Sequence, residues 1–226
     1  MKNKILVVAA HPDDEILGCG GTVAKMVRGG CSAFVLILGE GITSRYQTKD
    51  KENKNKEVKE LRNQLYKANK IIGAEKVFAF DLPDNKFDTI ALLEIIKLIE
   101  ETKKKIKPDI LYTHHRGDLN IDHRITYNAA LTACRPIKGE TVKEIYSFET
   151  PSSTEWNYPC RFSPNIFVNI ADSIDRKIEA MKCYKTELRT FPHPRSEEAV
   201  KIIAKRWGVH VGLNYAEAFE TIRILK

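Results

Sequence analysis

The chain has 226 residues, of which 42% are hydrophobic and 30% are charged, and its formal net charge is +7. This length fits one large α/β domain, and the balance of apolar and charged residues is typical of a globular protein rather than a disordered one. No stretch approaches the ~20 apolar residues of a membrane-spanning helix, and the first apolar run is too short for a signal peptide, so we expect a cytoplasmic protein without a membrane span.

Strand-like and helix-like segments alternate along the first part of the chain. Residues 4–9 form a continuous apolar run that predicts a buried strand, and residues 15–29 predict a helix that stops at Gly29 and Gly30. The same reasoning predicts strands over residues 32–38, 76–80 and 109–113 and helices over residues 50–72, 88–105 and 122–134, with a loop over residues 39–48. The helix over residues 88–105 is predicted to have an apolar side made of Ile90, Leu93, Ile96, Leu98 and Ile99.

The pattern is weaker after residue 140. It predicts short strands over residues 143–148 and 165–170, a loop over residues 151–164, and helices over residues 172–184 and 195–207. No repeat, low-complexity linker or change of composition marks a boundary. We therefore predict one domain over residues 1–226, with a core over residues 1–150 and a C-terminal elaboration over residues 151–226.

The predicted strands of the first part are apolar throughout, and helices separate them. Strands of this kind are buried on both faces of a parallel sheet, so we predict an α/β, Rossmann-like three-layer sandwich with a mostly parallel sheet. Ligands bind beyond the carboxyl ends of the strands in such sheets. Polar segments follow four of those ends here: residues 11–14, 39–41, 81–85 and 114–118.

The segment His11-Pro12-Asp13-Asp14-Glu15 carries the strongest sign of chemistry. An imidazole and three carboxylates at the end of a buried strand are costly to desolvate unless a cation lies among them. His and Asp supply ligands that zinc accepts, and a spare carboxylate can act on water. Helix capping would explain one Asp but not the whole segment. Glu15 is expected to stabilise the helix N-terminus electrostatically or to form a local hydrogen bond. A third ligand is expected from another strand end, where the candidates are His114, His115 and His123.

At these residues the chain resembles the PIG-L/LmbE-like de-N-acetylases, which act on amino sugars and sugar conjugates. The matching segments are residues 10–15, 20–21, 118–124 and 215–219, which together span nearly the whole chain. The resemblance implies a single zinc ion held by His11, Asp14 and His123. It also implies that Asp13 is the general base that takes a proton from the attacking water.

One position departs from the family pattern. Many members carry a histidine three residues before the last zinc ligand, where this chain has Asn120. An amide can donate a hydrogen bond to an oxyanion but cannot transfer a proton. His115 is therefore the favoured proton donor, with His114, or His210 from this chain or a neighbouring subunit, as alternatives. Asp122 is expected to orient a zinc-binding histidine from behind.

The predicted substrate contacts lie mostly in loops at the strand ends, where sugar hydroxyls would be bound. They are Arg45, Arg62, Asp84, Asn85 and His210, and ordinary surface positions are the alternative for the first four. Trp156 and Tyr158 could stack on a sugar ring or anchor their loop. Gly20 and Gly21 lack the spacing of a phosphate-binding GxGxxG loop, so close packing is the favoured interpretation.

The excess positive charge lies mostly in residues 49–59 and 103–107, which are typical of solvated helix faces. Attraction of an anionic substrate is the alternative interpretation. Nucleic-acid binding is not expected, because no recognition motif or stacking array of aromatic residues is present. The five cysteines are scattered without a CxxC pair, which argues against a disulfide framework or a zinc ribbon.

The residues and the resemblance together predict a zinc-dependent hydrolase that removes an acetyl or other acyl group from the amide nitrogen of an N-acetyl amino sugar or a sugar conjugate. The substrate could be phosphorylated or nucleotide-linked, and the protein could form a homo-oligomer. The alternatives are a metal-dependent amidase acting on a non-sugar amide and a non-catalytic sugar-binding relative. A Rossmann nucleotide-binding module is disfavoured, because carboxylates stand where phosphates would bind.

Overall fold

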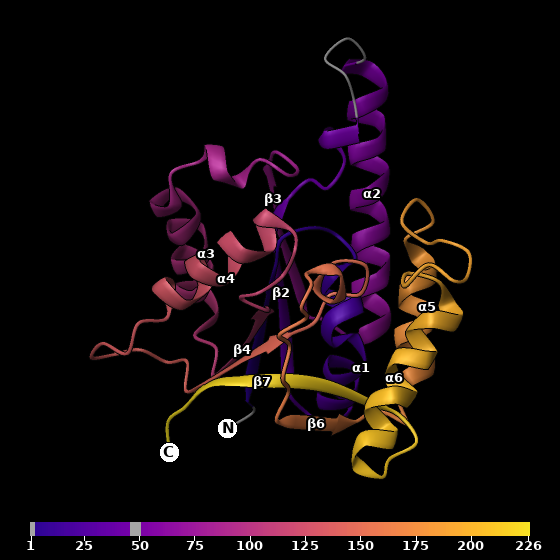
Figure 1. Ribbon diagram of the computed structural model, residues 1–226. Helices are drawn as coiled ribbons and strands as arrows, with labels where there is room; N and C mark the ends of the chain where they lie inside the picture. The colour runs from indigo at the N-terminus through magenta and orange to yellow at the C-terminus, as the bar shows by residue number, and fades with distance from the viewer. Residues whose placement is uncertain (1–2, 46–50) are drawn as a thin grey trace.

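The computed structural model describes residues 3–45 and 51–226, and its strands form one twisted sheet (Figure 1). In chain order the strands are β1 (Lys4–Ala9), β2 (Ser32–Gly39), β3 (Lys76–Leu82), β4 (Ile110–His114), β5 (Glu144–Phe148), β6 (Ile166–Asn169) and β7 (Ala216–Ile224). Across the sheet the order is β3-β2-β1-β4-β5-β7-β6. The first five strands pair in parallel, and β7 pairs antiparallel with both β5 and β6. The predicted mostly parallel sheet is confirmed.

Helices cover both faces of this sheet, which confirms the three-layer arrangement. The helices are α1 (Asp14–Arg28), α2 (Lys51–Ile72), α3 (Leu92–Ile106), α4 (Ile121–Ala133), α5 (Ile174–Cys183) and α6 (Glu197–Val211). Short 3-10 turns are η1 (Thr43–Arg45), η2 (Phe87–Thr89) and η3 (Thr154–Trp156). Helices α3 and α4 pack together on one face, and α1, α2 and α5 pack together on the other (Figure 1).

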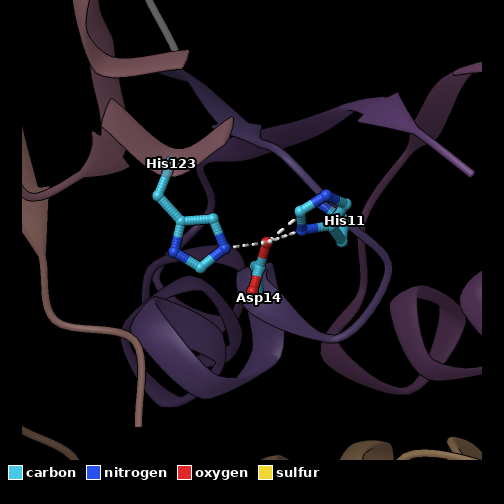
Figure 2. Close-up of side chains that lie close together, drawn as sticks. All are labelled: His11, Asp14 and His123. Carbon is cyan, nitrogen blue, oxygen red and sulfur yellow. Dashed lines mark hydrogen bonds and ion pairs between the residues drawn. The ribbon is translucent and has the colours of Figure 1, made fainter. Parts of the chain in front are cut away.

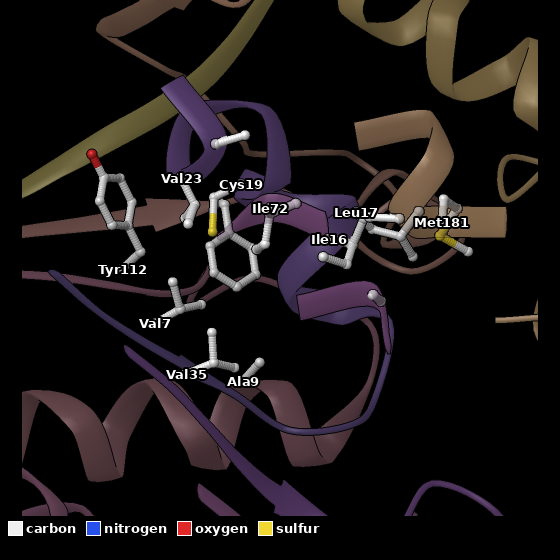
Figure 3. Close-up of a cluster of buried hydrophobic side chains, with 14 of the residues drawn as sticks. Val7, Ala9, Ile16, Leu17, Cys19, Val23, Val35, Ile72, Tyr112 and Met181 are labelled. Carbon is white, nitrogen blue, oxygen red and sulfur yellow. The ribbon is translucent and has the colours of Figure 1, made fainter. Parts of the chain in front are cut away.

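The apolar run of β1 divides between these two faces, because successive side chains of a strand point to opposite sides. Ile5, Val7 and Ala9 lie in the core beneath α1 and α2, whereas Leu6 and Val8 lie in the core beneath α3 and α4. Figure 3 shows the first core, where Val7 and Ala9 face residues of α1, α2 and α5. A strand that is buried on both faces therefore has a continuously apolar sequence, as β1 has from Ile5 to Ala9.

Strand β1 lies at the point where the strand order reverses. It pairs with β2 on one side and β4 on the other, so the connections after β1 and β4 leave the sheet at the same edge. In open α/β sheets this crevice is where ligands bind. The segment from His11 follows β1, and the segment from His115 follows β4.

Helix α1 is interrupted at Cys19, whose φ of −146° and ψ of 16° are not helical. The backbone N–H groups of Gly21 and Thr22 beyond the break donate to the carboxylate of Glu217 at 2.9 and 2.6 Å, and Lys177 pairs with the same carboxylate at 2.6 Å. A Cβ on Gly21 would lie 2.9 Å from Ile170, closer than real side chains approach. The close packing predicted for this glycine is confirmed, and its N–H already has a carboxylate partner from this chain.

The structure differs from the prediction at two elements, α3 and β7. Helix α3 begins at Leu92 rather than residue 88, because Ile90 is extended (φ −108°, ψ 136°) after the turn η2. On the predicted apolar side, Ile96 and Ile99 are buried but Leu93 is 59% exposed, and Ile95, which was not predicted, is fully buried. Strand β7 was not predicted, since its mixture of apolar and charged residues lacks the continuous apolar run that marks the other strands. Within the described residues, no helix has the length and apolar character needed to cross a bilayer.

Candidate active site

A cavity of about 190 Å³ opens at the carboxyl ends of β1 and β4. Its wall brings together residues that are far apart in the sequence, including His11, Asp13, Asp14, Asn120, His123 and Arg195. They come from the turn after β1, from the start of α4 and from the segment before α6. The edge of the sheet that the sequence predicted as the ligand site therefore carries the polar cavity.

His11, Asp14 and His123 form a compact group in this wall (Figure 2). Their ligand atoms all lie within 4.8 Å of one another. The Oδ2 atom of Asp14 lies between the two rings, 3.3 Å from His123 Nε2 and 3.6 Å from His11 Nδ1. All three side chains are buried. One carboxylate oxygen and two imidazole nitrogens thus point to a common centre.

The second nitrogen of each imidazole faces a different buried aspartate. His11 Nε2 is 2.9 Å from Asp122 Oδ2, and His123 Nδ1 is 3.1 Å from Asp118 Oδ1. A carboxylate behind a histidine fixes the ring and the position of its proton, which leaves the other nitrogen free to bind a metal. The geometry is therefore that of metal-binding histidines, with Nδ1 of His11 and Nε2 of His123 as the available donors.

Electrostatics also favour a cation at this centre. Burial opposes charge on His123, but Asp14 and Asp118 beside it raise its pKa to about 9. Burial opposes ionisation of Asp14 too, yet the charge of His123 and the hydrogen bond with His11 hold its pKa well below the usual range. Protons on the imidazoles thus balance the carboxylates here, and a divalent ion would take over that role as it releases them. The donor set fits a small ion such as zinc.

Asp13 occupies a backbone conformation that is unusual for a residue with a side chain, with a φ of 101°. Its N–H donates to Glu15 Oε2 at 3.1 Å, and its Oδ2 accepts from Arg195 at 3.3 Å. Asp14 turns the other way, toward the histidines. Burial and the charge of Asp14 raise the pKa of Asp13 well above the usual value, although Arg195 opposes that shift. The turn therefore directs two adjacent carboxylates to different places.

Glu15 lies beneath this turn rather than in the cavity wall. It is fully buried, and its carboxylate accepts from Tyr184, from Asn69 and from the N–H of Asp13. Burial raises its pKa to about 7. Its contacts support the turn that carries Asp13.

Of the two other candidate histidines, His115 points away from the centre of the site, whereas His114 Nε2 lies 3.4 Å from Asp14 Oδ2. His114 Nε2 accepts from the N–H of Ala10 at 2.9 Å, its ring stacks on His123, and burial lowers its pKa to about 3. His115 Nδ1 lies 3.1 Å from Glu220, and its ring packs against Phe162. Among the described residues, neither is part of the cavity wall. The prediction that His115 donates the proton is therefore not supported by its position.

Asn120 does line the cavity, and it has two contacts of its own. Its side chain caps α4 by accepting from the N–H of Asp122 at 2.8 Å, and its Nδ2 donates to Asn85 at 3.2 Å. Asp84 and Asn85, two of the residues predicted to contact substrate, also line the cavity. Asp84 is 3.3 Å from His11 Nε2 and accepts from the hydroxyl of Ser44.

Two other predicted substrate contacts lie elsewhere in the described part of the chain. Arg62 pairs with Asp81 at 2.5 Å beside the outer strand β3. His210 packs against Phe167 and Trp207 near the end of α6. The side chain of Arg45 lies outside the described residues. Trp156 packs against His193 with 5.9 Å between ring centres, and this contact supports the interpretation that Trp156 anchors its loop.

Sequence reasoning missed three residues of this region: Asp118, Glu187 and Arg195. Asp118 precedes the helix that carries His123, and this position could have indicated that it lies behind that histidine. Arg195 and Glu187 lie after residue 150, where no pattern in the sequence connects them to the strand ends. Arg195 donates to Glu187 at 2.9 Å as well as to Asp13.

We expect Asp122→Asn to weaken metal binding by about 10- to 100-fold. Asp122 accepts from the N–H groups of Asn85 and Phe87 with its two oxygens, so an amide would leave one backbone donor unpaired and would remove the carboxylate charge beside Nε2 of His11. Metal titration by isothermal calorimetry checks this. Asp88→Asn, an exposed change in the turn η2, is the control, and equal metal affinity in the two variants would show that Asp122 does not orient His11.

Comparison with known proteins identifies a family and several relatives that this chain resembles in sequence. Residues 6–134 match the family model of the GlcNAc-PI de-N-acetylases, PIG-L. The chain is 29% identical to the uncharacterized deacetylase YaiS of Escherichia coli, over 80% of this chain and 90% of that protein. It is 24% identical to the diacetylchitobiose deacetylase of Thermococcus kodakarensis, over 97% of this chain and 83% of that one.

Solved structures share the fold across the whole chain. The conserved protein TT1542 from Thermus thermophilus has a TM-score of 0.78 at 26% identity, covering 100% of this chain and 97% of that chain. GalB, the 4-carboxy-2-hydroxymuconate hydratase from Pseudomonas putida, has a TM-score of 0.78 at 23% identity, covering 100% and 99%. The second likeness concerns the fold alone, and it shows that this fold also serves a reaction other than deacetylation.

Proposed function

The chain belongs to the PIG-L family of de-N-acetylases, and we propose that it is a zinc-dependent hydrolase that removes the acetyl group from an N-acetyl amino sugar or a conjugate of one. The observation that carries this proposal is the placement of Asp13 in the same cavity wall as His11, Asp14 and His123. A carboxylate that is free of the ligand group, yet beside it, is what hydrolysis needs in addition to a metal.

In this proposal His11 Nδ1, Asp14 and His123 Nε2 hold the ion. Zinc bound there would polarise the amide carbonyl and make water more acidic. Asp13 takes a proton from the attacking water, since it lines the cavity beside the ligand group, and its raised pKa makes its ionised form a stronger base. The Nδ2 group of Asn120 is the amide donor in the wall for the oxygen that becomes negative.

Asp13 is also our candidate for returning the proton to the departing amine. His115, the donor expected from the sequence, lies against Glu220 instead of the cavity. An Asp that has accepted a proton as base can donate it as acid in the next step. This assignment needs no further titrating group in the wall.

The charges of the wall favour an uncharged sugar over a phosphorylated one. Four carboxylates line the cavity, those of Asp13, Asp14, Asp84 and Glu187, and when all are ionised and the imidazoles are neutral they exceed the charges of a divalent ion and Arg195 by one among the described lining residues. A phosphate close to the amide would be repelled by this excess even with a divalent ion bound. The net positive charge of the whole chain therefore does not indicate an anionic substrate at this site.

We expect zinc-loaded protein to release amine from N-acetylglucosamine or N,N′-diacetylchitobiose with a kcat/KM roughly tenfold or more above that for N-acetylglucosamine 6-phosphate, a difference of about 1.4 kcal/mol. A fluorescent amine assay over such a panel, with added zinc, measures it. Preference for the phosphorylated sugar would restore the expectation of an anionic substrate.

The same assay tests the proposed function against its alternatives. A non-sugar amidase would act on simple acyl amides in place of sugars, and a sugar-binding relative would bind the sugars without releasing amine. Amine release that does not depend on zinc would contradict the proposed role of the metal.

We also propose that residues 1–226 form one domain, because β6 and β7 belong to the common sheet and Arg195 lines the cavity.

A further inference from the structure

Arg195 is the side-chain partner that the structure gives to the carboxylate of Asp13. Its Nη1 donates to Asp13 Oδ2 at 3.3 Å, and the same nitrogen donates to Glu187 Oε2 at 2.9 Å. Both carboxylates are almost fully buried, whereas the arginine side chain is 22% exposed at the cavity. One guanidinium thus joins the candidate base to a second carboxylate from a distant part of the chain.

The backbone around Arg195 is well fixed for a residue in a connecting segment. Its N–H donates to His193 Nδ1 at 3.1 Å, and the next residue, Ser196, caps α6 by accepting from the N–H of Ala199 at 3.0 Å. Arg195 is therefore fixed at its backbone beside the start of α6 and at its guanidinium by Glu187. A side chain anchored at both ends can fix the direction of a group that it contacts.

The same segment also supports the backbone of Asp13. The hydroxyl of Tyr184, a fully buried residue, donates to Glu15, and the other oxygen of Glu15 accepts the N–H of Asp13. Glu187 is one turn further on and is tied to Tyr184 by a backbone hydrogen bond of 3.0 Å. Residues 184–195 thus reach Asp13 twice, once through its N–H and once through its carboxylate.

This support matches a need of the turn itself. A φ of 101° is costly for a residue with a Cβ, so it persists only where the surroundings hold it. The carboxylate of Asp13 must also avoid the histidines that Asp14 contacts. Neither requirement is met by the residues of the turn alone.

We propose that residues 184–195 form a clamp that sets the direction of the Asp13 carboxylate, with Arg195 as its positioning residue. The inference rests on the proposed function for its kinetic consequence, because Asp13 is the base there. Arg195 does not act on the substrate in this view. It acts by keeping Asp13 turned toward the cavity.

The kinetic test uses zinc-loaded enzyme and a neutral N-acetyl sugar. We expect Arg195→Met to lower kcat by about 10- to 100-fold, the effect of misplacing a reacting group by ~1 Å, with KM and zinc content near those of the parent. Arg195→Lys should keep part of the rate. Added guanidinium should restore part of the rate of Arg195→Ala, which a general loss of structure would not allow.

The control is Arg28→Met, which removes an exposed arginine that also pairs with an aspartate, Asp172. It should leave kcat unchanged. A parental kcat in Arg195→Met would overturn the clamp, and so would a raised KM with unchanged kcat, because that result would make Arg195 a substrate contact.

Crystal structures of the parent and of Arg195→Met provide a test that does not need activity. We expect the Asp13 carboxylate to rotate away from the cavity in the variant, and an unmoved carboxylate would refute the clamp. If the parent protein released amine from no N-acetyl substrate, the proposed function would fail, while this structural comparison would still decide whether Arg195 positions Asp13.

Discussion

Replacing Asp13 with Asn should reduce turnover by about 10²- to 10⁴-fold, the range that general-base catalysis supplies, while the protein keeps its zinc. The amide cannot take a proton from water. The metal should stay because its three candidate ligands, His11, Asp14 and His123, are untouched. The measurements are kcat on a neutral N-acetyl sugar and zinc per chain by elemental analysis.

The choice of Asn follows from the backbone at this position. Asn tolerates a positive φ better than most residues with a side chain, so the turn at φ 101° should survive, whereas Ala would add strain to the loss of the carboxylate. Asp172→Asn, an exposed change, is the matched control. If Asp13→Asn kept most of the parental rate, another group would have to be the base.

His123→Ala should lose the bound metal and, with it, activity. This residue supplies one of the two imidazole donors, and Asp14 and His11 alone are not expected to retain the ion at dilute concentrations. The loss of affinity should be at least as large as the ~10- to 100-fold that follows from removing an outer partner such as Asp122. Zinc content after dialysis, and a competition titration with a chelator, measure it.

His115→Ala is the appropriate control for that experiment. It removes a buried histidine only a few residues along the chain, but one that faces Glu220 rather than Asp14. It should therefore retain zinc. Equal zinc content in His123→Ala and His115→Ala would move the third ligand elsewhere, and metal loss in His115→Ala alone would make His115 the ligand.

Several features of the fold could be predicted because they are local properties of the sequence. Continuous apolar runs such as residues 4–9 imply strands buried on both faces, and the helices between them imply parallel connections. A mostly parallel sheet follows, and with it the edge where ligands bind. The predictions were wrong at the start of α3 and at β7, where apolar and polar residues are mixed. Strand β7 lies between β5 and β6, and these neighbours determine its pairing.

The candidate site could be predicted only in part, and His114 and His115 show why. The two histidines are neighbours at the end of β4, but adjacent residues at the end of a strand point to opposite faces. His114 stacks on His123, and His115 turns to Phe162 and Glu220. The residue composition of a strand end is visible in the sequence, whereas the direction of each side chain depends on register.

By itself, the sequence determined the type of fold and the gathering of His11, Asp13 and Asp14 at one strand end, because periodicity and adjacency are written into neighbouring residues. The tertiary structure alone decided which aspartate stands behind each histidine, and that Arg195 reaches Asp13 across 182 positions of the chain. Such contacts depend on how distant segments pack. No pattern of neighbouring residues predicts that Arg195, which precedes α6, packs against the turn after β1.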